Sequence, residues 1–576
     1  DQLKKLGISA DWSRTRFTMD PEYSKEVINA FIHYYKKGLI YRGLRTTNWC
    51  IRCGTSLSEL ELEYEDEKAA LYYIKYAENL IVATTRPETM LGDTAVAINP
   101  NDKRYAKLIS KEIILPITNR KIPIIPDKEI DMEFGTGAVK VTPAHDITDF
   151  EIGQRHNLPS IQVIDERGRM NEKARNYAGT KIKEAREKII EDLKKEGLLQ
   201  KEEPYDHRVA KCYRCGNTIE PLPSKQWFLK MEKLAAASLK TITDKKVQIL
   251  PKNFEKVSLN WLKNIKDWTI SRQIWWGHQL PVWFCEKNSE EFIVNENKPK
   301  NCPFCKNCEM EQSPDVLDTW FSSALWPFAG LSPKDKKEFY PGNLVSNARE
   351  ILNLWDIRMI FSGLEFMGKP PFKNVFIHAT ILTKEGKRMS KSLGTGIDPL
   401  KYIEEHGADA TRFGILWQSF GQDIRWDEAN VIAGKKFANK IWNASRFVLQ
   451  KIADSETRPI NFQKTQIPKP ETAEDKKVLT QLKATKEKVA KDIENFEFGQ
   501  ALHEIYKFFW HNYCDVYIEK SKKQLADEKC KTSTEKILLH VLLESLKMLH
   551  PFMPFITEEI YGKITKEKKL LMAEKW

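Results

Sequence analysis

The stretch that decides the fold of this chain is residues 386–394, which read GKRMSKSLG. Two lysines, Lys387 and Lys391, flank a short polar loop in which Ser390 and Ser392 add hydroxyl donors. Lysine is a mobile point charge suited to phosphate oxygens, and serine favours a tight local turn. Because negative charge accumulates on phosphates in the transition state of adenylate formation, the pattern points to ATP chemistry. A solvated Lys/Ser loop is the plainer alternative.

The composition is that of a multidomain protein. A chain of 576 residues is too long for one hydrophobic core, so we expect roughly three or four domains. The formal net charge of +12 is spread along the chain and allows a polyanionic partner. No stretch approaches the roughly 18–20 apolar residues of a membrane span, and the amino end shows no signal pattern. We therefore expect a soluble, cytoplasmic protein with no membrane partner.

The hydrophobic pattern changes along the chain. We expect residues 1 to about 48 to be mostly helical, because residues 23–37 carry apolar side chains at helical spacing, and 181–199 do so again. Between them, short β-branched runs bounded by Pro, Gly, Asn and Asp predict a strand-rich module over 64–163, which we interpret as a barrel; the runs are 81–85, 113–116, 122–125 and 138–141. A mixed α/β region over 204–427 precedes long helices beyond 433, with a loop expected over 454–471.

Eight of the ten cysteines fall in two short-spaced clusters, which favours metal ligation over disulfides. Cys50 and Cys53 form one CxxC pair, and Cys212 and Cys215 form another, with the strand-rich module between them. Four thiolates suit one tetrahedral structural Zn²⁺ that would close the base of the module. Buried unpaired thiols are the alternative.

The second cluster is less regular. It comprises Cys285, Cys302, Cys305 and Cys308, with Asn288 where a regular first knuckle would have its second cysteine. Cys308 must then complete the ligand set. We predict a second zinc site here.

Several longer segments resemble one family over nearly the whole chain. Residues 83–96 read ATTRPETMLGDTAV, and residues 135–149 read GTGAVKVTPAHDITD. Together with the 386–394 loop they resemble the class I aminoacyl-tRNA synthetases and, among these, the valyl-tRNA synthetases; the leucyl and isoleucyl members would show TRPDTLFG and TTPWTL instead of the first segment. Further matches are residues 48–53, 57–64, 267–283 (DWTISRQIWWGHQLPVW), 315–328 (DVLDTWFSSALWPF), 437–447 and 550–561.

The resemblance implies a multidomain α/β fold. A partial Rossmann-like class I catalytic domain would carry an inserted β-barrel editing domain, zinc knuckles and a C-terminal α-helical anticodon-binding domain. The expected domains are residues 1–57 (catalytic segment and first knuckle), 58–203 (editing), 204–430 (catalytic domain with the second knuckle, the ribbon-like cluster and the loop) and 431–576 (anticodon-binding).

The resemblance also implies a synthetic site. Lys391 matches the lysine that the family uses on ATP, bound with Mg²⁺, while Arg388 replaces the family's first lysine. Trp276 and Trp320 match the walls of the valine slot, although either could be ordinary core, and His378 matches a residue beside the adenine. The remaining expected catalytic residues of the loop are Lys387, Ser390 and Ser392.

A second, hydrolytic site is implied because threonine is nearly isosteric with valine. A slot that admits valine rejects threonine only about a hundredfold, a figure known for this family itself. A polar pocket that bonds the threonine hydroxyl would finish the discrimination. Singly, each matched residue could be a solvated surface group, but by resemblance Asp149 pairs with the substrate ammonium. The editing residues are Thr85, Arg86, Asp93, Lys140, Asp146 and Asp149.

The expected function is therefore ATP-dependent valylation of tRNA(Val) through valyl-adenylate, with hydrolysis of threonyl-tRNA(Val), by a monomer. The family's HIGH segment and the segment with its ammonium-binding aspartate do not occur in these 576 residues, so we expect a fragment without useful adenylation. Three alternatives stay open: an isoleucyl-tRNA synthetase, a trans-editing deacylase that binds tRNA, and a zinc-ribbon nucleic-acid binder. The last would not account for residues 83–149.

Overall fold

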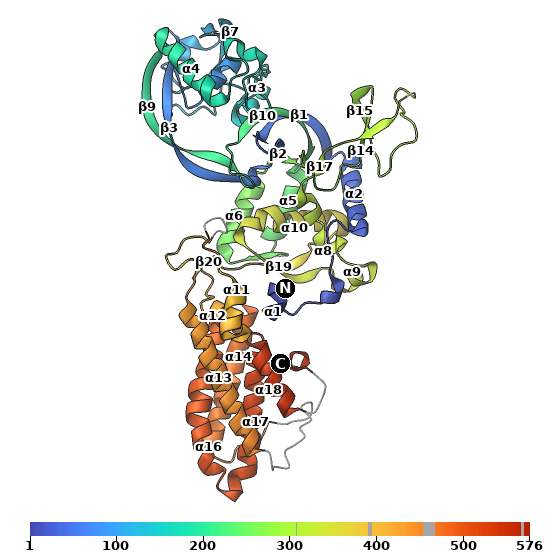
Figure 1. The fold of residues 1–576 in the computed structure, drawn as a ribbon, viewed down its shortest axis with the longest axis vertical. Helices are drawn as coiled ribbons and strands as arrows, with labels where there is room; N and C mark the ends of the chain where they lie inside the picture. The colour runs from blue at the N-terminus through green and yellow to red at the C-terminus, as the bar shows by residue number, and fades with distance from the viewer. Residues whose placement is uncertain (307, 390–393, 453–466, 566–569, 576) are drawn as a thin grey trace. The chain divides into compact units, whose positions relative to one another are not determined.

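The computed structural model describes residues 1–306, 308–389, 394–452, 467–565 and 570–575 (Figure 1). The chain divides into two compact units. One unit contains residues 16–345 and 350–375, and the other contains residues 1–15, 346–349 and 376–576. Lys391, Ser390 and Ser392 of the predicted ATP loop lie outside the described residues.

The first unit is built on an antiparallel four-stranded sheet. Its order is β12 (Trp268–Thr269), β10 (Glu220–Leu229), β1 (Ile40–Cys50) and β2 (Thr55–Leu57). The helix expected over 23–37 is confirmed as α2 (Pro21–Lys36), but the expectation of mostly helix up to about residue 48 is wrong, because Ile40–Cys50 pairs with β10 as strand β1. Its apolar stripe is buried because Val27 and Phe31 belong to the same core as Trp227 of β10. Proline at the first helical position fits the start of α2.

An inserted module follows β2 and returns at β10. Strands β3 (Leu62–Ala77) and β9 (Leu199–Cys212) run antiparallel along their length, seen in blue and green in Figure 1. The four predicted strand runs are confirmed as β4 (Leu80–Thr84), β6 (Glu112–Leu115), β7 (Arg120–Pro126) and β8 (Ala138–Val141). They lie in two sheets, β4–β3–β9 and β6–β7–β5–β8, where β5 is Ala95–Ile98. The barrel stays a prediction.

Two helices complete the module. α3 (Ile147–Arg155) follows β8 directly, and the predicted second helix is confirmed as α4 (Ile182–Lys195). Ala185, Ile189 and Leu193 repeat at steps of four and are fully buried in the module's core. The helix therefore covers the sheet with one apolar face.

The region between β10 and residue 377 mixes short strands and helices. A three-stranded sheet has the order β11 (Gln248–Leu250), β19 (Phe372–Ile377), β18 (Gly342–Asn347). Its neighbouring helices are α5 (Glu232–Thr243), α6 (Lys252–Lys263) and α10 (Ile357–Met367). The short strands β13 (Ser271–Arg272) and β17 (Val316–Leu317) pair with each other, and short helices follow as α7 (Thr319–Ser323), α8 (Trp326–Ala329) and α9 (Pro333–Phe339).

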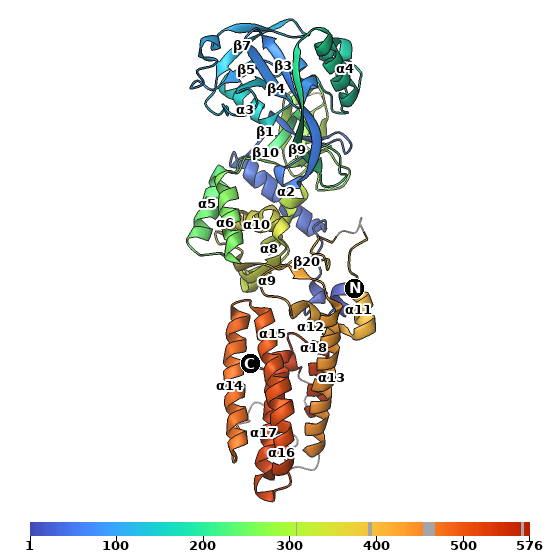
Figure 2. The ribbon, with the colours of Figure 1, turned by 90° about the vertical axis from the view of Figure 1, so that its left-hand side faces the viewer.

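The second unit is mostly helical, as the pattern beyond residue 433 predicted. Figure 2 shows its long helices α13 (Glu428–Lys451), α14 (Ala473–Glu494) and α17 (Glu528–Leu549) side by side. Shorter helices are α11 (Pro399–His406), α12 (Ala408–Leu416), α15 (Phe498–Tyr506), α16 (Glu519–Gln524) and α18 (Pro554–Ile564). The expected loop over 454–471 lies mainly outside the described residues. Among the helices described, none is long and apolar enough to cross a membrane.

Candidate functional site

The two segments matched to the hydrolytic site lie on neighbouring strands. β5 pairs antiparallel with β8, so that Val96 stands opposite Lys140. The helical turn before β5 (Pro87–Gly92) is thereby held against β8. Gly92 lets the same turn lie close to the segment at Ile161, because a Cβ there would lie 2.6 Å from the backbone oxygen of Ile161. Residues 44 positions apart in the sequence, such as Val96 and Lys140, thus form one pocket wall.

A buried chain of hydrogen bonds links the polar groups of this wall. Lys140 Nζ donates to Thr142 Oγ1 at 2.5 Å and to Thr89 Oγ1 at 2.8 Å, and it lies 3.4 Å from Asp93 Oδ1. Thr142 donates to Asp93 Oδ1 at 2.5 Å, and the Tyr76 hydroxyl donates to Asp93 Oδ2 at 2.7 Å. Burial raises the pKa of Asp93 although the Lys140 charge acts against it. The wall is polar but water-poor, so an unpaired group in it would be costly.

Asp149 joins this wall from the first turn of α3. Its Oδ2 accepts from the Thr142 backbone N–H at 2.8 Å, and its own N–H donates to Asp146 Oδ1 at 3.0 Å. Asp146 is the exposed N-cap of α3, a position that favours aspartate. Burial, together with the charge of Asp146, raises the pKa of Asp149 to about 7. A positively charged group beside Asp149 would favour its ionised form.

Arg86 has a different setting from the other predicted pocket residues. Its Nη1 donates to the His145 carbonyl at 3.1 Å, and its guanidinium pairs with the carboxylates of Glu88 and Glu220. Thr85, beside it, is partly buried. The structure therefore brings Asp93, Lys140 and Asp149 together and joins Arg86 to a separate charge cluster.

Three contributors to the pocket were missed by sequence reasoning. Thr142 lies at the centre of the hydrogen-bond chain, and Thr89 and Tyr76 complete it. Thr142 could have been suspected, because it follows Lys140 by two residues and so shares its face of the strand. Tyr76 gave no signal, since it lies on β3, outside the matched segments.

His145 is buried in the same module but is chemically occupied. Its Nε2 accepts from the Val163 N–H at 2.9 Å. Burial, and then the charge of Arg86, lower the pKa of His145 to about 3. A neutral ring whose lone pair is already used cannot take a proton from water near neutral pH. His145 is thus fixed as a structural group.

The segments matched to the synthetic site meet through the pairing of β13 with β17, where Arg272 stands opposite Val316. The fully buried Arg272 bonds Glu61 at 2.6 Å and Asp318 at 2.7 Å, and Trp268 Nε1 donates to Asp318 at 2.8 Å. These groups hold the two segments together.

The predicted synthetic-site residues themselves are divided between the units. Trp276 is 59% exposed and Trp320 is partly buried, both in the first unit. In the second unit, His378 Nδ1 lies 2.9 Å from the Ala379 carbonyl. The exposed Lys387 donates its backbone N–H to Thr383 Oγ1 at 3.2 Å. The exposed Arg388 forms an isolated antiparallel β-bridge with Leu382 through the backbone. Their roles stay predictions.

Both cysteine clusters are assembled in three dimensions. The Sγ atoms of Cys50 and Cys215 lie 3.5 Å apart, and those of Cys53 and Cys212 lie 4.0 Å apart. Tetrahedral zinc with sulfur bonds of about 2.3 Å requires sulfur separations of about 3.8 Å, so the four positions fit that metal. The cysteines of both clusters are not in disulfides.

The second cluster is also gathered, at the hairpin β14 (Val282–Cys285), β15 (Asn288–Val294) and the strand β16 (Met310–Gln312). Its sulfur separations are 3.4 Å for Cys285 and Cys308, 3.9 Å for Cys285 and Cys305, and 2.9 Å for Cys305 and Cys308. Cys302 lies within the same group. The ligand set is complete, with one separation shorter than zinc would require.

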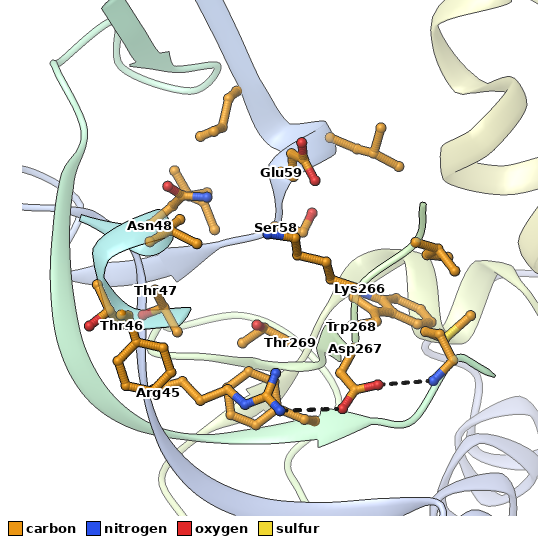
Figure 3. A pocket seen from close by; sticks show the side chains of 18 of the residues that line it. Arg45, Thr46, Thr47, Asn48, Ser58, Glu59, Lys266, Asp267, Trp268 and Thr269 are labelled. Carbon is orange, nitrogen blue, oxygen red and sulfur yellow. Dashed lines mark hydrogen bonds and ion pairs between the residues drawn. The ribbon is translucent and has the colours of Figure 1, made fainter. Parts of the chain in front are cut away.

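A cavity of about 620 Å³ lies in the same unit, lined by parts of β1, α3 and the residues before β12 (Figure 3). Two ion pairs lie within its wall: Arg45 Nη2 lies 3.6 Å from Asp267 Oδ2, and Lys266 Nζ lies 2.5 Å from Glu151 Oε1. Asp267 also accepts from the Met231 backbone N–H at 3.2 Å. None of the site residues predicted from the sequence lines it, and we assign no substrate group to it.

Comparison with known families agrees with this arrangement. The family model of class I tRNA synthetases (I, L, M and V) matches residues 1–427, and that of the anticodon-binding domain of tRNA ligases matches residues 475–576. The chain belongs to the class I tRNA synthetases, which are ligases.

Within the class, the chain is similar to valine–tRNA ligases. That of Carboxydothermus hydrogenoformans is 46% identical over 100% of this chain and 66% of the relative, and that of Thermotoga maritima is 47% identical over 100% and 67%. The predicted resemblance to valyl-tRNA synthetases is confirmed. The chain spans about two thirds of the length of the curated relatives it matches.

Solved structures confirm the fold. The agnB2 LeuRS of Agrobacterium radiobacter K84, in its ternary complex with tRNA and LeuAMS, gives a TM-score of 0.56 at 18% identity and covers 100% of this chain and 77% of that one. A Mycobacterium tuberculosis methionyl-tRNA synthetase bound by methionyl-adenylate gives 0.55 at 14%, covering 97% and 78%.

Proposed function

We propose that this chain serves the ATP-dependent attachment of valine to tRNA(Val) through valyl-adenylate, and that its inserted module hydrolyses threonyl-tRNA(Val). The observation that carries the second part is the buried polar wall of Asp93, Lys140, Thr142 and Asp149. Bound threonine could pair its hydroxyl with such a wall, whereas valine would leave buried polar groups unpaired. The wall would thus bind threonine in preference to valine, as a site that hydrolyses only threonyl-tRNA(Val) requires.

The roles within this wall follow from charge and position. Asp149 receives the substrate ammonium, because it is the buried carboxylate whose ionised form a cation would stabilise. Lys140 and Thr142 lie where they can bond the threonine hydroxyl. His145 is excluded as the general base by its bond to the Val163 N–H. A positioned water and the terminal hydroxyl of the tRNA therefore carry out ester hydrolysis.

The proposal includes cofactors. ATP with Mg²⁺ would meet the loop that contains Lys387, Arg388 and Lys391, and the charge of that loop would stabilise the phosphates in the transition state. The cysteine clusters would hold structural Zn²⁺, since the first fits tetrahedral sulfur ligation. Zinc there would tie both ends of the inserted module to one point. We also propose a cytoplasmic monomer.

Hydrolysis of two charged tRNAs tests the editing proposal. The chain is expected to deacylate threonyl-tRNA(Val) and to spare valyl-tRNA(Val), and Lys140→Met should remove most of the activity because it takes the cation out of the wall. Lys194→Met is the matched control: it removes a surface lysine of α4 in the same module. Equal loss of both amino acids from the tRNA, or an unchanged rate with Lys140→Met, would contradict the assignment.

The isoleucyl alternative is less well supported. The relatives that match the full chain at 46–47% identity carry the name valine–tRNA ligase. Deacylation of threonyl-tRNA(Ile) or valyl-tRNA(Ile) in preference to threonyl-tRNA(Val) would favour the isoleucyl alternative. The trans-editing alternative predicts a different result. A trans-editing protein would deacylate mischarged tRNA but would show no ATP–pyrophosphate exchange.

A further inference from the structure

Arg86 connects three parts of the first unit. Its Nη1 donates to the His145 carbonyl, which belongs to the second pocket segment. Its Nη2 pairs with Glu220, the first residue of β10, which stands opposite Trp49 of β1. Its own segment begins the helical turn that carries Thr89. One side chain therefore ties both pocket segments to the four-stranded sheet outside the module.

The surrounding charges balance without a substrate. Arg186 of α4 forms two hydrogen bonds of 2.8 Å with the fully buried Glu88. The Arg86 Nε also lies 3.5 Å from Glu88 Oε1. The cluster also contains Glu220, whose side chain is only 9% exposed. It therefore consists of two guanidinium groups, from Arg86 and Arg186, and the two carboxylates of Glu88 and Glu220. The cluster has no net charge to offer a ligand. Arg86 is thus engaged before any substrate arrives.

The backbone that Arg86 holds leads directly to the pocket. The His145 carbonyl precedes Asp146, whose side chain caps α3 by accepting from the Asp149 N–H at 3.0 Å. The His145 ring is fixed from its other side by the Val163 N–H. A shift of this carbonyl would therefore move the start of α3, and with it Asp149 relative to the Thr142 N–H.

We propose that Glu220 is a positioning residue of the hydrolytic pocket: it holds Arg86, which fixes the His145 carbonyl and so places Asp146 and Asp149. The inference rests on the proposed editing function. It also revises the role of Arg86, which sequence analysis grouped with the pocket's donors. Arg86 acts through the backbone, and Glu220, which lies outside both matched segments, controls the geometry of the pocket.

The test compares the preference for threonyl- over valyl-tRNA(Val), measured as the ratio of the two kcat/KM values. Partial unfolding lowers both values together and leaves this ratio unchanged, whereas a displaced pocket changes it. Glu220→Gln, which keeps the shape and removes the charge, is expected to lower the ratio about tenfold, since small misplacements of site groups cost up to about 100-fold. Glu220→Asp should restore most of the preference.

Three further variants complete the design. Arg86→Lys should lower the ratio to a similar extent, and combining it with Glu220→Gln should add little, because both act through one contact. Asp192→Asn, which removes a partly exposed carboxylate of α4 that is bonded to Tyr177, is the control and should leave the ratio unchanged. A normal ratio in Glu220→Gln, or multiplicative losses in the double variant, would overturn the inference. If the unaltered chain shows no preference, the proposed function itself fails.

Discussion

The pKa of Asp149 predicts a measurable pH dependence of editing. The productive encounter needs an ionised Asp149, whose pKa is about 7, and a protonated substrate amine. An α-amino group has a pKa of about 8, so both conditions hold only in a narrow window. With those two values the productive fraction is about 0.09 at pH 6 and about 0.6 at pH 7.5. We therefore expect kcat/KM for threonyl-tRNA(Val) to rise about sevenfold between these pH values and to fall again above pH 8.

The assay is the deacylation rate at limiting threonyl-tRNA(Val), after subtraction of uncatalysed ester hydrolysis at each pH. Asp149→Asn is the control variant, because it keeps the shape of the side chain and removes its titration. Its kcat/KM should be about 10- to 150-fold lower at pH 7.5, which corresponds to losing a charge-assisted hydrogen bond of about 1.5–3 kcal/mol. The acid limb should disappear with it.

Two results would refute this reasoning, and a third would change the role assigned to Asp149. A profile that stays flat between pH 6 and pH 7.5 would mean that Asp149 is already ionised in the free enzyme. An acid limb that survives in Asp149→Asn would mean that another group controls the rate. A loss confined to kcat, with KM unchanged, would instead make Asp149 a general base rather than the ammonium's partner.

Three further predictions concern stability, zinc and ATP. Burial raises the pKa of Asp149 in the fold, so its contribution to stability is fully present below about pH 4 and is lost as pH rises through 7. The Tm of Asp149→Asn should therefore exceed that of the unaltered chain by more at pH 8 than at pH 5. An equal difference in Tm at the two pH values would contradict this. Cys212→Ser should remove about one zinc per chain by metal analysis and lower Tm, whereas Cys530→Ser should change neither. In a full-length enzyme, Lys391→Ala should cost about 3 kcal/mol of transition-state stabilisation in ATP–pyrophosphate exchange. Unaltered exchange would refute that assignment.

The elements with strong local patterns were predictable. α2 and α4 carry apolar residues at helical spacing, and both form close to the expected bounds. β8 has the predicted bounds, 138–141, because alternating β-branched residues between glycine and proline leave few other structures. The assembly of Cys50 with Cys212 also followed from spacing alone, since two CxxC pairs on either side of an insertion suit one metal ion.

What could not be predicted depends on contacts between distant segments. The different roles of the charged editing residues are the clearest case. Sequence analysis placed Arg86 and Lys140 in the same group of pocket residues. In the structure Lys140 lies in the pocket wall, whereas Arg86 is neutralised by Glu88 and Glu220. The partner Glu220 is 134 residues from Arg86 in the sequence, and no local pattern marks it.

The same contrast shows how the fold accommodates a polar pocket. Each buried charge of the inserted module described above is paired by a residue from another strand or helix: Asp93 with Lys140, Glu88 with Arg186, Arg86 with Glu220. Asp149 differs, because burial and then the like charge of Asp146 raise its pKa, and the charge of Lys140 opposes them only in part. A substrate ammonium would supply the missing positive charge. The loss of the Asp149 charge should therefore weaken editing and stabilise the fold together.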